Sequence, residues 1–172
     1  MGDTLRVTRC ITACALCLAC ALPVAAQTRA SLDVSGGWMG FPDDGYLANE
    51  VLAGTALRIG VTPRLAVGPE LVYVRGEGHS HLILTGNLTF DLRAPAARPR
   101  ATPFLVAGGG LYQTRTPFFG ETFTSREGAF TAGGGVRVPA GDRGTLGVEA
   151  RMGWEAHLRV NAVFGWRLGP AS

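Results

Sequence analysis

Eight stretches of the chain alternate hydrophobic residues with polar or small ones at a period of two. Successive side chains of an extended strand point to opposite faces, so this period predicts β-strands. No apolar stretch shows a helical period. The predicted strands span about residues 29–39, 50–61, 64–75, 81–93, 102–114, 127–138, 144–154 and 157–168. An even number of antiparallel strands can close without a free edge. We therefore expect an all-β fold, an eight-stranded antiparallel up-and-down barrel.

One predicted strand, TPFLVAGGGLYQT (102–114), contains three consecutive glycines. Glycine weakens a strand because it costs backbone entropy and offers no side chain to pack. The alternation predicts Phe104, Val106 and Tyr112 on the apolar face of this strand, with Ala107 and Gly109 on the other face. A sheet that has lipid on one side and a crowded lumen on the other would tolerate such a run.

The two faces of the predicted strands differ in composition. One is aliphatic and aromatic, without charge in the middle of any strand; the other carries isolated charges among glycine and alanine. The apolar face includes Leu32, Val34, Trp38, Val51, Leu57, Leu71, Tyr73, Leu84, Phe90, Phe130, Val148, Met152, Val160 and Phe164. The opposite face includes Asp33, Gly54, Ala56, Arg58, Glu70, Asn87, Asp91, Gly133, Arg137, Glu149, Arg151, Arg159 and Arg167.

Alternation alone leaves two orientations open. A soluble lipocalin-like barrel places its apolar face inward, around a ligand, whereas a transmembrane barrel places it against lipid. The sparse polar face favours the transmembrane barrel, because a solvated exterior would carry many long charged side chains, and small residues suit a narrow eight-stranded interior.

The positions of the aromatic residues also favour lipid on the apolar face. If the first strand runs outward, two aromatic belts result, one at each bilayer interface. The outer belt contains Trp38, Tyr73, Tyr112, Phe130 and Trp154, and the inner belt contains Phe90, Phe104, Phe164 and Trp166. Phe104 and Tyr112 would then mark the two membrane surfaces.

The connectors alternate in character along the chain. Residues 40–49, 76–80 and 115–126 are predicted to be polar loops on the outer side, while 61–64 and 139–143 are tight turns and 94–101 is a proline-rich turn. Long outer loops and short periplasmic turns are typical of outer-membrane barrels. Pro69 falls inside a predicted strand, where it lacks a donor for the ladder, so we expect a bulge there.

The first 26 residues have the pattern of a cleaved signal peptide. Arg6 and Arg9 precede an apolar run from Ile11 to Leu22, and Val24-Ala25-Ala26 supplies small residues for cleavage. We therefore predict a signal peptide at 1–26 and one barrel domain at 27–172, exported to the outer membrane. All four cysteines lie in the first 26 residues, so the remaining chain is predicted to have no disulfide, thiolate metal site or cysteine nucleophile.

Charge excludes one class of partner. All sixteen basic residues are arginine; without Arg6, Arg9 and Asp3 the remaining chain has 14 arginines and 12 acidic residues, a net charge of +2. These charges are balanced and dispersed, which does not indicate nucleic-acid binding.

Four stretches resemble strands of the eight-stranded outer-membrane β-barrel superfamily, which includes OmpA/OmpX-like and opacity-type surface proteins. They are TPFLVAGGGLYQT, AFTAGGGVRVP, TLGVEARMGW and LRVNAVFGWRL, within a resemblance that covers residues 27–170. The resemblance implies inward Arg and Glu positions in the penultimate strands. It also implies a closing strand recognised by the outer-membrane assembly machinery.

The inward charges are the first candidate site. Isolated charges in a narrow lumen are costly, but paired ones are tolerated. We expect a salt-bridge network that plugs the lumen, formed by Arg58, Glu70, Asp91, Arg137, Glu149, Arg151 and Arg159, with Asp33 and Arg167 on the same face. The alternative is a narrow pore, in which an arginine excess would favour anions.

The segment GEGHSHL (76–82) is the second candidate. His79 and His81 project to the same side, an arrangement that can bind a metal weakly or serve a hydrolase. Ser80 points away, however, and the sequence places no acid to orient either histidine. We expect a polar loop tip, with no catalytic residue, cofactor or metal.

The third candidate is RTPFFGETFTS (115–125), in which Phe118, Phe119 and Phe123 form a possible surface-contact loop. Taken together, the sequence favours a structural or surface-exposed outer-membrane protein that is not an enzyme. Its expected partners are outer-membrane lipid, the assembly machinery during biogenesis and an unknown surface partner. A small lipid-modifying enzyme remains an alternative.

Overall fold

The computed structural model describes residues 29–43, 46–93, 101–119 and 121–169. The signal peptide predicted for residues 1–26, with its cysteines, lies outside the described residues. Among the described residues, no helix is long and apolar enough to cross a membrane. The strands are β1 (Ala30–Asp43), β2 (Tyr46–Gly60), β3 (Leu65–Arg75), β4 (Ser80–Asp91), β5 (Thr102–Phe118), β6 (Glu121–Ala140), β7 (Gly144–Gly153) and β8 (Leu158–Leu168), and a 3-10 turn, η1 (Trp154–Ala156), precedes β8.

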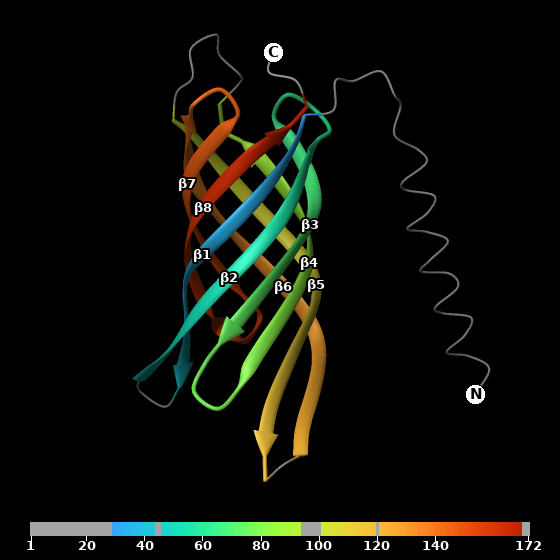
Figure 1. Cartoon of the computed structure of the whole chain (residues 1–172), viewed down its shortest axis with the longest axis vertical. Coiled ribbons are helices and arrows are strands. Elements are labelled where there is room, and N and C mark those ends of the chain that lie inside the picture. The colour runs from blue at the N-terminus through green and yellow to red at the C-terminus, as the bar shows by residue number, and fades with distance from the viewer. Residues whose placement is uncertain (1–28, 44–45, 94–100, 120, 170–172) are drawn as a thin grey trace, which may run out of the picture.

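The eight strands form a closed antiparallel barrel in which each strand pairs with its sequence neighbours (Figure 1). Closure comes from β1 and β8, which pair from Ala30↔Leu168 to Gly40↔Leu158. Since every strand has two partners, the sheet has no open edge to template aggregation. The predicted fold class, an eight-stranded up-and-down barrel, is confirmed.

The two ends of the barrel differ. We call the end that carries the β1–β2, β3–β4, β5–β6 and β7–β8 connectors the distal end, and the end near the C-terminus the terminal end (Figure 1). At the distal end β5 and β6 continue as a long hairpin, paired without interruption to Phe118↔Glu121. The prediction of loops at 40–49 and 115–126 is therefore mostly wrong. β1 pairs with β2 as far as Asp43↔Tyr46, and β5 pairs with β6 to Phe118↔Glu121, so both regions extend strands.

Burial alternates along the strands with the apolar residues outside. In β3, Glu70 is 5% exposed and its neighbour Leu71 is 41% exposed. The same inversion recurs in β7, where Val148 and Met152 are exposed while Glu149 and Arg151 are buried. A water-soluble barrel would have the opposite arrangement, because burying charge while exposing aliphatic surface is unfavourable in water.

The strand β5 has the opposite phase to the one the sequence predicts. Phe104, Val106 and Tyr112 point into the lumen, each 4% exposed, whereas Leu105 and Leu111 are more than half exposed on the outer surface. Phe104 and Tyr112 thus do not belong to the aromatic belts. Both faces of β5 carry apolar residues, so alternation did not fix its phase. In the observed phase Gly110 lies on the inward face, where the backbone of β4 comes close. A Cβ at Gly110, for example, would overlap the carbonyl oxygen of Leu84.

The predicted bulge at Pro69 is also wrong. The β3–β4 register runs unbroken through Pro69↔Gly86. On the other side, the β2–β3 pairing resumes in the same register after a gap between Ala56↔Glu70 and Ile59↔Val67. The missing N–H of proline is therefore accommodated by a local gap in one ladder, without an inserted residue.

Candidate functional site

Among the described residues, four acidic and four basic side chains form ion pairs inside the barrel, away from the distal end. They are Asp33, Glu70, Asp91 and Glu149, with Arg58, Arg137, Arg151 and Arg159. Alternation places them there, since each lies on the inward phase of its strand. Arg167, which the sequence put on the same face, is exposed.

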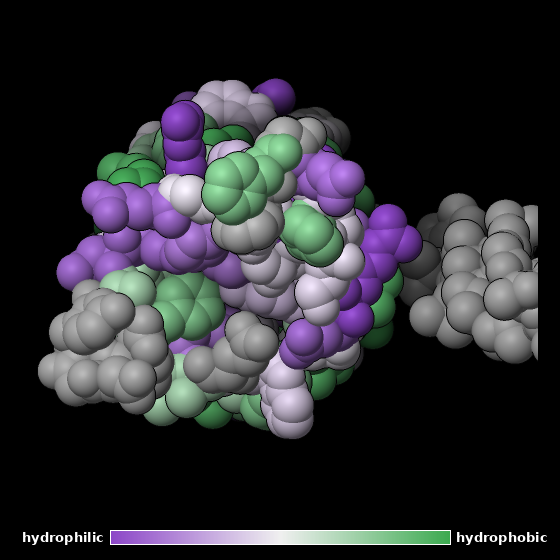
Figure 2. Space-filling view, turned by 90° about the horizontal axis from the view of Figure 1, so that it is seen from below, coloured by the Kyte–Doolittle hydropathy of each residue, from purple (hydrophilic) through white to green (hydrophobic). Residues whose placement is uncertain are grey.

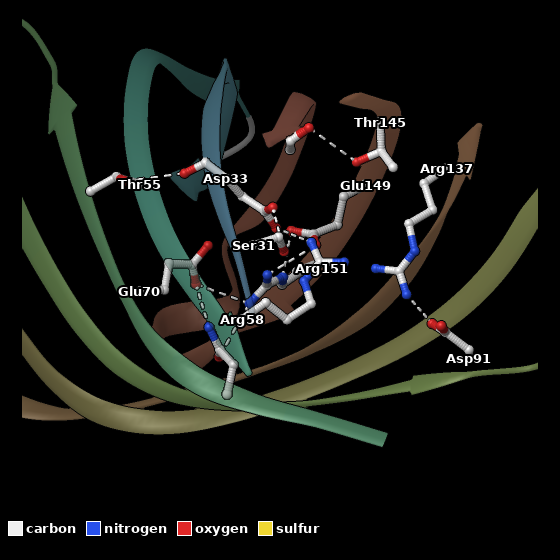
Figure 3. A network of polar contacts seen from close by, with 12 residues as sticks. Ser31, Asp33, Thr55, Arg58, Glu70, Asp91, Arg137, Thr145, Glu149 and Arg151 are labelled. Atoms are coloured by element: carbon white, nitrogen blue, oxygen red, sulfur yellow. Dashed lines mark hydrogen bonds and ion pairs between the residues drawn. The ribbon is translucent and has the colours of Figure 1, made fainter. Parts of the chain in front are cut away.

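Glu70 on β3 binds side chains from three other strands, β4, β7 and β8; Figure 3 shows its carboxylate turned toward the arginines of the network. Arg159 Nη2 donates to both of its carboxylate oxygens, at 2.8 and 2.9 Å, and Arg151 Nη1 donates to Oε2 at 3.0 Å. Arg151 also donates through Nε and Nη2 to the two oxygens of Glu149, at 2.5 and 2.9 Å. Such two-pronged charged hydrogen bonds are strong and directional. The Nδ2 group of Asn87 donates to Glu70 at 2.9 Å and completes the unit.

Two further pairs lie beside this unit. Arg58 donates to Asp33, which ties β2 to β1, and Arg137 donates to Asp91, which ties β6 to β4. The ring of Phe104 lies against both arginines, with the guanidinium carbons of Arg137 and Arg58 at 5.0 and 5.9 Å from its centroid. These cation–π contacts give the inward phase of Phe104 a physical role.

Little space remains around the network. A cavity of about 30 Å³ lies among Asp33, Arg58, Glu70 and Arg151, among other residues. That volume corresponds to about one water molecule. With equal numbers of opposite charges, the buried groups compensate one another's desolvation.

An apolar layer separates the charge network from the distal end. Along β3 the inward residues run from Glu70 through Val72 and Val74 to Gly76, which begins the β3–β4 turn. The layer consists of Met39, Leu52, Val72, Val74, Ile83 and Tyr112. The lumen therefore has a charged section toward the terminal end, an apolar layer in the middle and a separate mouth at the distal end.

The distal mouth contains a carboxylate and two imidazoles that face one another. Glu50 Oε1 contacts His79 Nε2, and Glu50 Oε2 lies 3.4 Å from His81 Nε2. The Glu50 side chain is 2% exposed, and that of His79 is 33% exposed. The two imidazole rings contact edge to face, with centroids 4.8 Å apart. We call Glu50, His79 and His81 the mouth cluster.

Local strand geometry explains this convergence. Glu50 shares the inward phase of β2 with Leu52, and its strand neighbour Val51 pairs with Arg75 at the end of β3. The turn that follows closes through Gly76 N–H donating to the His79 carbonyl at 3.2 Å. That turn brings His79 over Glu50, and His81 enters on the inward phase of β4.

The expectation that no acid is placed near these histidines is wrong, because Glu50 contacts both. The signal was present in the sequence, since Glu50 continues the inward series of Gly54, Ala56 and Arg58. Alternation alone could not bring it to the histidines, because that contact depends on the turn closed by Gly76 and His79. Ser80 falls on the outward phase with Leu82, as the sequence indicates.

His157 lies in the connector that precedes β8, beside the rings of Phe41 and Tyr112, which also contact the ring of His81. Its Nδ1–H donates to the Trp154 carbonyl at 2.6 Å, and its ring lies 5.7 Å from Phe41 and 6.5 Å from Tyr112. Burial lowers the pKa of His157; the hydrogen bond to Trp154 opposes that shift, and the charge of Arg159 adds to it. The neutral imidazole is thus the favoured form.

The third candidate region is the tip of the β5–β6 hairpin. Phe119 is 92% exposed, with a positive φ of 48°, and Phe123 is 57% exposed. Phe118 ends β5, and the placement of its side chain lies outside the described part of the chain. Below the tip, Arg126 donates to Gln113 at 3.0 Å, beside Arg115 on the same open face. Figure 2 shows hydrophilic residues gathered over the distal end, with hydrophobic residues among them and around the margin.

Comparison with solved structures identifies the fold. The chain is similar to Neisserial surface protein A, with a TM-score of 0.67 and 9% identity over 83% of this chain and 98% of that one. It is also similar to the N-terminal barrel of Pseudomonas aeruginosa OprF, with a TM-score of 0.64 and 10% identity over 83% and 100% of the two chains.

A third similar structure is Ail of Yersinia pestis, with a TM-score of 0.52 and 12% identity over 83% and 99% of the two chains. A scan against protein-family models and a search of curated proteins find no match. The chain therefore has the fold of the eight-stranded outer-membrane β-barrels, as its sequence pattern indicates. Because the sequence identities are so low, the similarity shows the fold alone.

Proposed function

We propose that the chain is an integral outer-membrane protein with a structural and surface-contact role, in which the barrel crosses the bilayer and the distal end faces outward. The observation that carries this proposal is the inverted burial, with Glu70 inside and Leu71 outside on adjacent positions. An apolar exterior around a charged interior is stable in lipid and unstable in water. Exposed aromatics support two belts, with Tyr73, Phe130 and Trp154 toward the distal end and Phe90, Phe164 and Trp166 toward the terminal end.

The lumen is proposed to be closed to ions. Glu70 binds Arg151 and Arg159 across the barrel, Glu149 binds the same two arginines from β7, and the apolar layer lies between them and the distal end. An ion would have to break these contacts and cross an unsolvated section. The alternative, a narrow pore, predicts stepwise conductance in planar bilayers at neutral pH, whereas the closed lumen predicts a baseline current.

The β5–β6 hairpin is proposed to be the contact element. It extends beyond the other strands, carries exposed Phe119 and Phe123 at its tip and presents Arg115 and Arg126 on one face. Aromatic and arginine side chains are the types most enriched in binding hot spots. Ail, which shares the fold, has been solved in complex with the heparin analogue sucrose octasulfate. By analogy, a polyanionic glycan is the partner class we propose for the arginine-bearing face.

Membrane fractionation tests the location. The expressed protein should require detergent for extraction and should migrate differently on a gel before and after heating, because a folded barrel resists the detergent until it is boiled. A soluble, monomeric product without heat-modifiable mobility would overturn the proposal and return the lipocalin-like alternative.

Binding to heparin-coated surfaces tests the hairpin. Replacing Arg115 and Arg126 by glutamine should weaken binding at least several-fold while leaving the heat-modifiable shift unchanged. Arg143, which is exposed at the terminal end, offers a matched control. Equal binding by wild type, the double variant and the control would count against a glycan-contact role for this face.

A further inference from the structure

We propose that the mouth cluster is a binding site for a divalent transition metal, with Zn²⁺ the reference ion, coordinated by the Glu50 carboxylate and the Nε2 atoms of His79 and His81. The ligand atoms of the three residues all lie within 4.8 Å of one another. Two imidazoles and one carboxylate are a common protein ligand set for zinc and its neighbours in the first transition row. This site is separate from the charge network and from the β5–β6 hairpin.

One ligand separation already matches a tetrahedral ion, whereas Glu50 Oε1 and His79 Nε2 are in direct contact and would move apart when an ion binds between them. With metal–ligand bonds of about 2.0–2.1 Å, two ligand atoms of a tetrahedron lie about 3.4 Å apart. The His81 Nε2 to Glu50 Oε2 separation is 3.4 Å. A fourth position would be open to water or an external ligand, since His79 is partly exposed at the mouth.

Both rings have a hydrogen-bond partner at Nδ1 and direct Nε2 toward Glu50, so that a metal would replace the contact of His79 Nε2 with the carboxylate. His79 Nδ1 lies 3.0 Å from the Glu77 carbonyl, which can only accept, so Nδ1 carries the proton. His81 Nδ1 lies 3.0 Å from Thr114 Oγ1. In a neutral imidazole that donates from Nδ1, the lone pair is on Nε2, and this second hydrogen bond is the usual way in which a metal-binding histidine is oriented.

The side chains around Glu50 leave one of its two carboxylate oxygens without a hydrogen bond. Its Oε2 atom is buried without a hydrogen bond, 3.4 Å from His81 Nε2. A buried, incompletely bonded carboxylate is costly. A bound cation would satisfy both of its oxygens, and the ligands come from β2, the β3–β4 turn and β4, so the ion would also cross-link the distal rim.

Gly76 keeps space open between two of the ligands. A Cβ at this position would lie 2.8 Å from His79 Nε2 and would overlap a Glu50 carboxylate oxygen. Gly76 is not among the residues with positive φ, so its backbone does not require glycine. The absence of a side chain here therefore matters for the space beside the ligands, and an alanine would fill that space without removing a ligand.

The competing arrangement is a simple ion pair between protonated His79 and Glu50, with no metal. The experiment uses residues 27–172 refolded in detergent micelles, without a histidine tag and after treatment with a chelator. Titration calorimetry with Zn²⁺, and the visible absorption of Co²⁺ as an independent signature, measure stoichiometry, affinity and geometry. Heat-modifiable mobility confirms that each sample is folded, which keeps this test independent of membrane location.

We expect one equivalent of Zn²⁺ to bind and Co²⁺ to give the intense visible bands of a four-coordinate site. His81→Gln and Gly76→Ala should each weaken binding by about tenfold or more. His157→Gln and Gly128→Ala should bind as wild type, because His157 is outside the cluster and a Cβ at Gly128 meets nothing within 4 Å. Ca²⁺ and Mg²⁺, which prefer oxygen ligands, should not compete.

Two results would overturn the proposal. One is the absence of saturable Zn²⁺ binding in folded wild-type protein, which would leave the ion pair as the explanation. The other is binding that survives both His81→Gln and Gly76→Ala in folded samples, which would place the metal elsewhere on the surface.

Discussion

Arg159 in β8 and Glu70 in β3 are 89 residues apart in sequence, yet Arg159 Nη2 donates to both carboxylate oxygens of Glu70 at 2.8 and 2.9 Å. The two strands are not neighbours in the sheet, so this contact crosses the lumen and braces opposite walls of the barrel. Both side chains are nearly inaccessible to solvent. Arg159 lies on β8, the strand that closes the barrel, so its ion pair with Glu70 forms only when the barrel is closed.

Removing one partner of this pair should strongly destabilise the barrel. Arg159→Met leaves Glu70 and Glu149 with only Arg151, and breaking a buried pair typically costs roughly 3–5 kcal/mol. The free energy of unfolding in urea, measured in lipid vesicles, checks this. The double variant Glu70→Leu with Arg159→Met keeps the Glu149–Arg151 pair balanced and should be less destabilised than the single variant. A single variant as stable as wild type would show that the pair contributes little.

A lipid-facing charge should impair insertion. Leu84 is half exposed on the outer surface near the middle of the β3–β4 ladder. Leu84→Arg should cost roughly 2–4 kcal/mol near the bilayer midplane. The measurement is the yield of heat-modifiable protein in the membrane fraction, with Leu84→Ala as the size control. Normal assembly of Leu84→Arg beside normal assembly of the control would contradict the outward-apolar assignment.

Strand number, order and most facing directions could be predicted because each strand except β5 presents one clearly apolar face. β5 could not be phased in this way. Its two faces, Phe104-Val106-Tyr112 and Leu105-Leu111, are equally hydrophobic, and the choice depends on tertiary contacts such as Phe104 with Arg58 and Arg137. The extensions of β1–β2 and β5–β6 at the distal end were not predicted for a related reason. Where both faces of a hairpin carry polar residues, hydrophobic and polar positions no longer alternate, and the pattern does not indicate a strand.

The lumen charges could be placed on one face by alternation, but their partners could not be chosen, because pairing across a closed barrel depends on strand stagger. The mouth cluster illustrates the same limit. His79 and His81 are visible as a pair in the sequence, whereas Glu50 joins them only because the turn at Gly76 folds His79 back over β2.

The inverted phase of β5 can be tested by cysteine labelling. Residues 27–172 contain no cysteine, so a maleimide can label only the single cysteine that is introduced. Leu105→Cys should react with a lipid-soluble maleimide in the folded, membrane-inserted protein, because this position faces outward. Val106→Cys should stay unlabelled until the barrel is unfolded, because Val106 is 4% exposed in the lumen. The opposite labelling pattern would restore the phase that the sequence pattern favoured.

Burial of His157 should make the distal end sensitive to acid. Its pKa is lowered in the folded state, chiefly by burial, so the unfolded chain binds the proton more readily. The contribution to stability is complete above the unfolded pKa of about 6.5 and is lost as pH falls through the lower folded value. His157→Gln cannot titrate and can still donate to the Trp154 carbonyl. Urea unfolding in vesicles at pH 8 and pH 5 should show a smaller loss of stability in this variant than in wild type. An equal loss in both proteins would assign the acid sensitivity to other groups, such as the lumen carboxylates, and would show that His157 is not held neutral by its site.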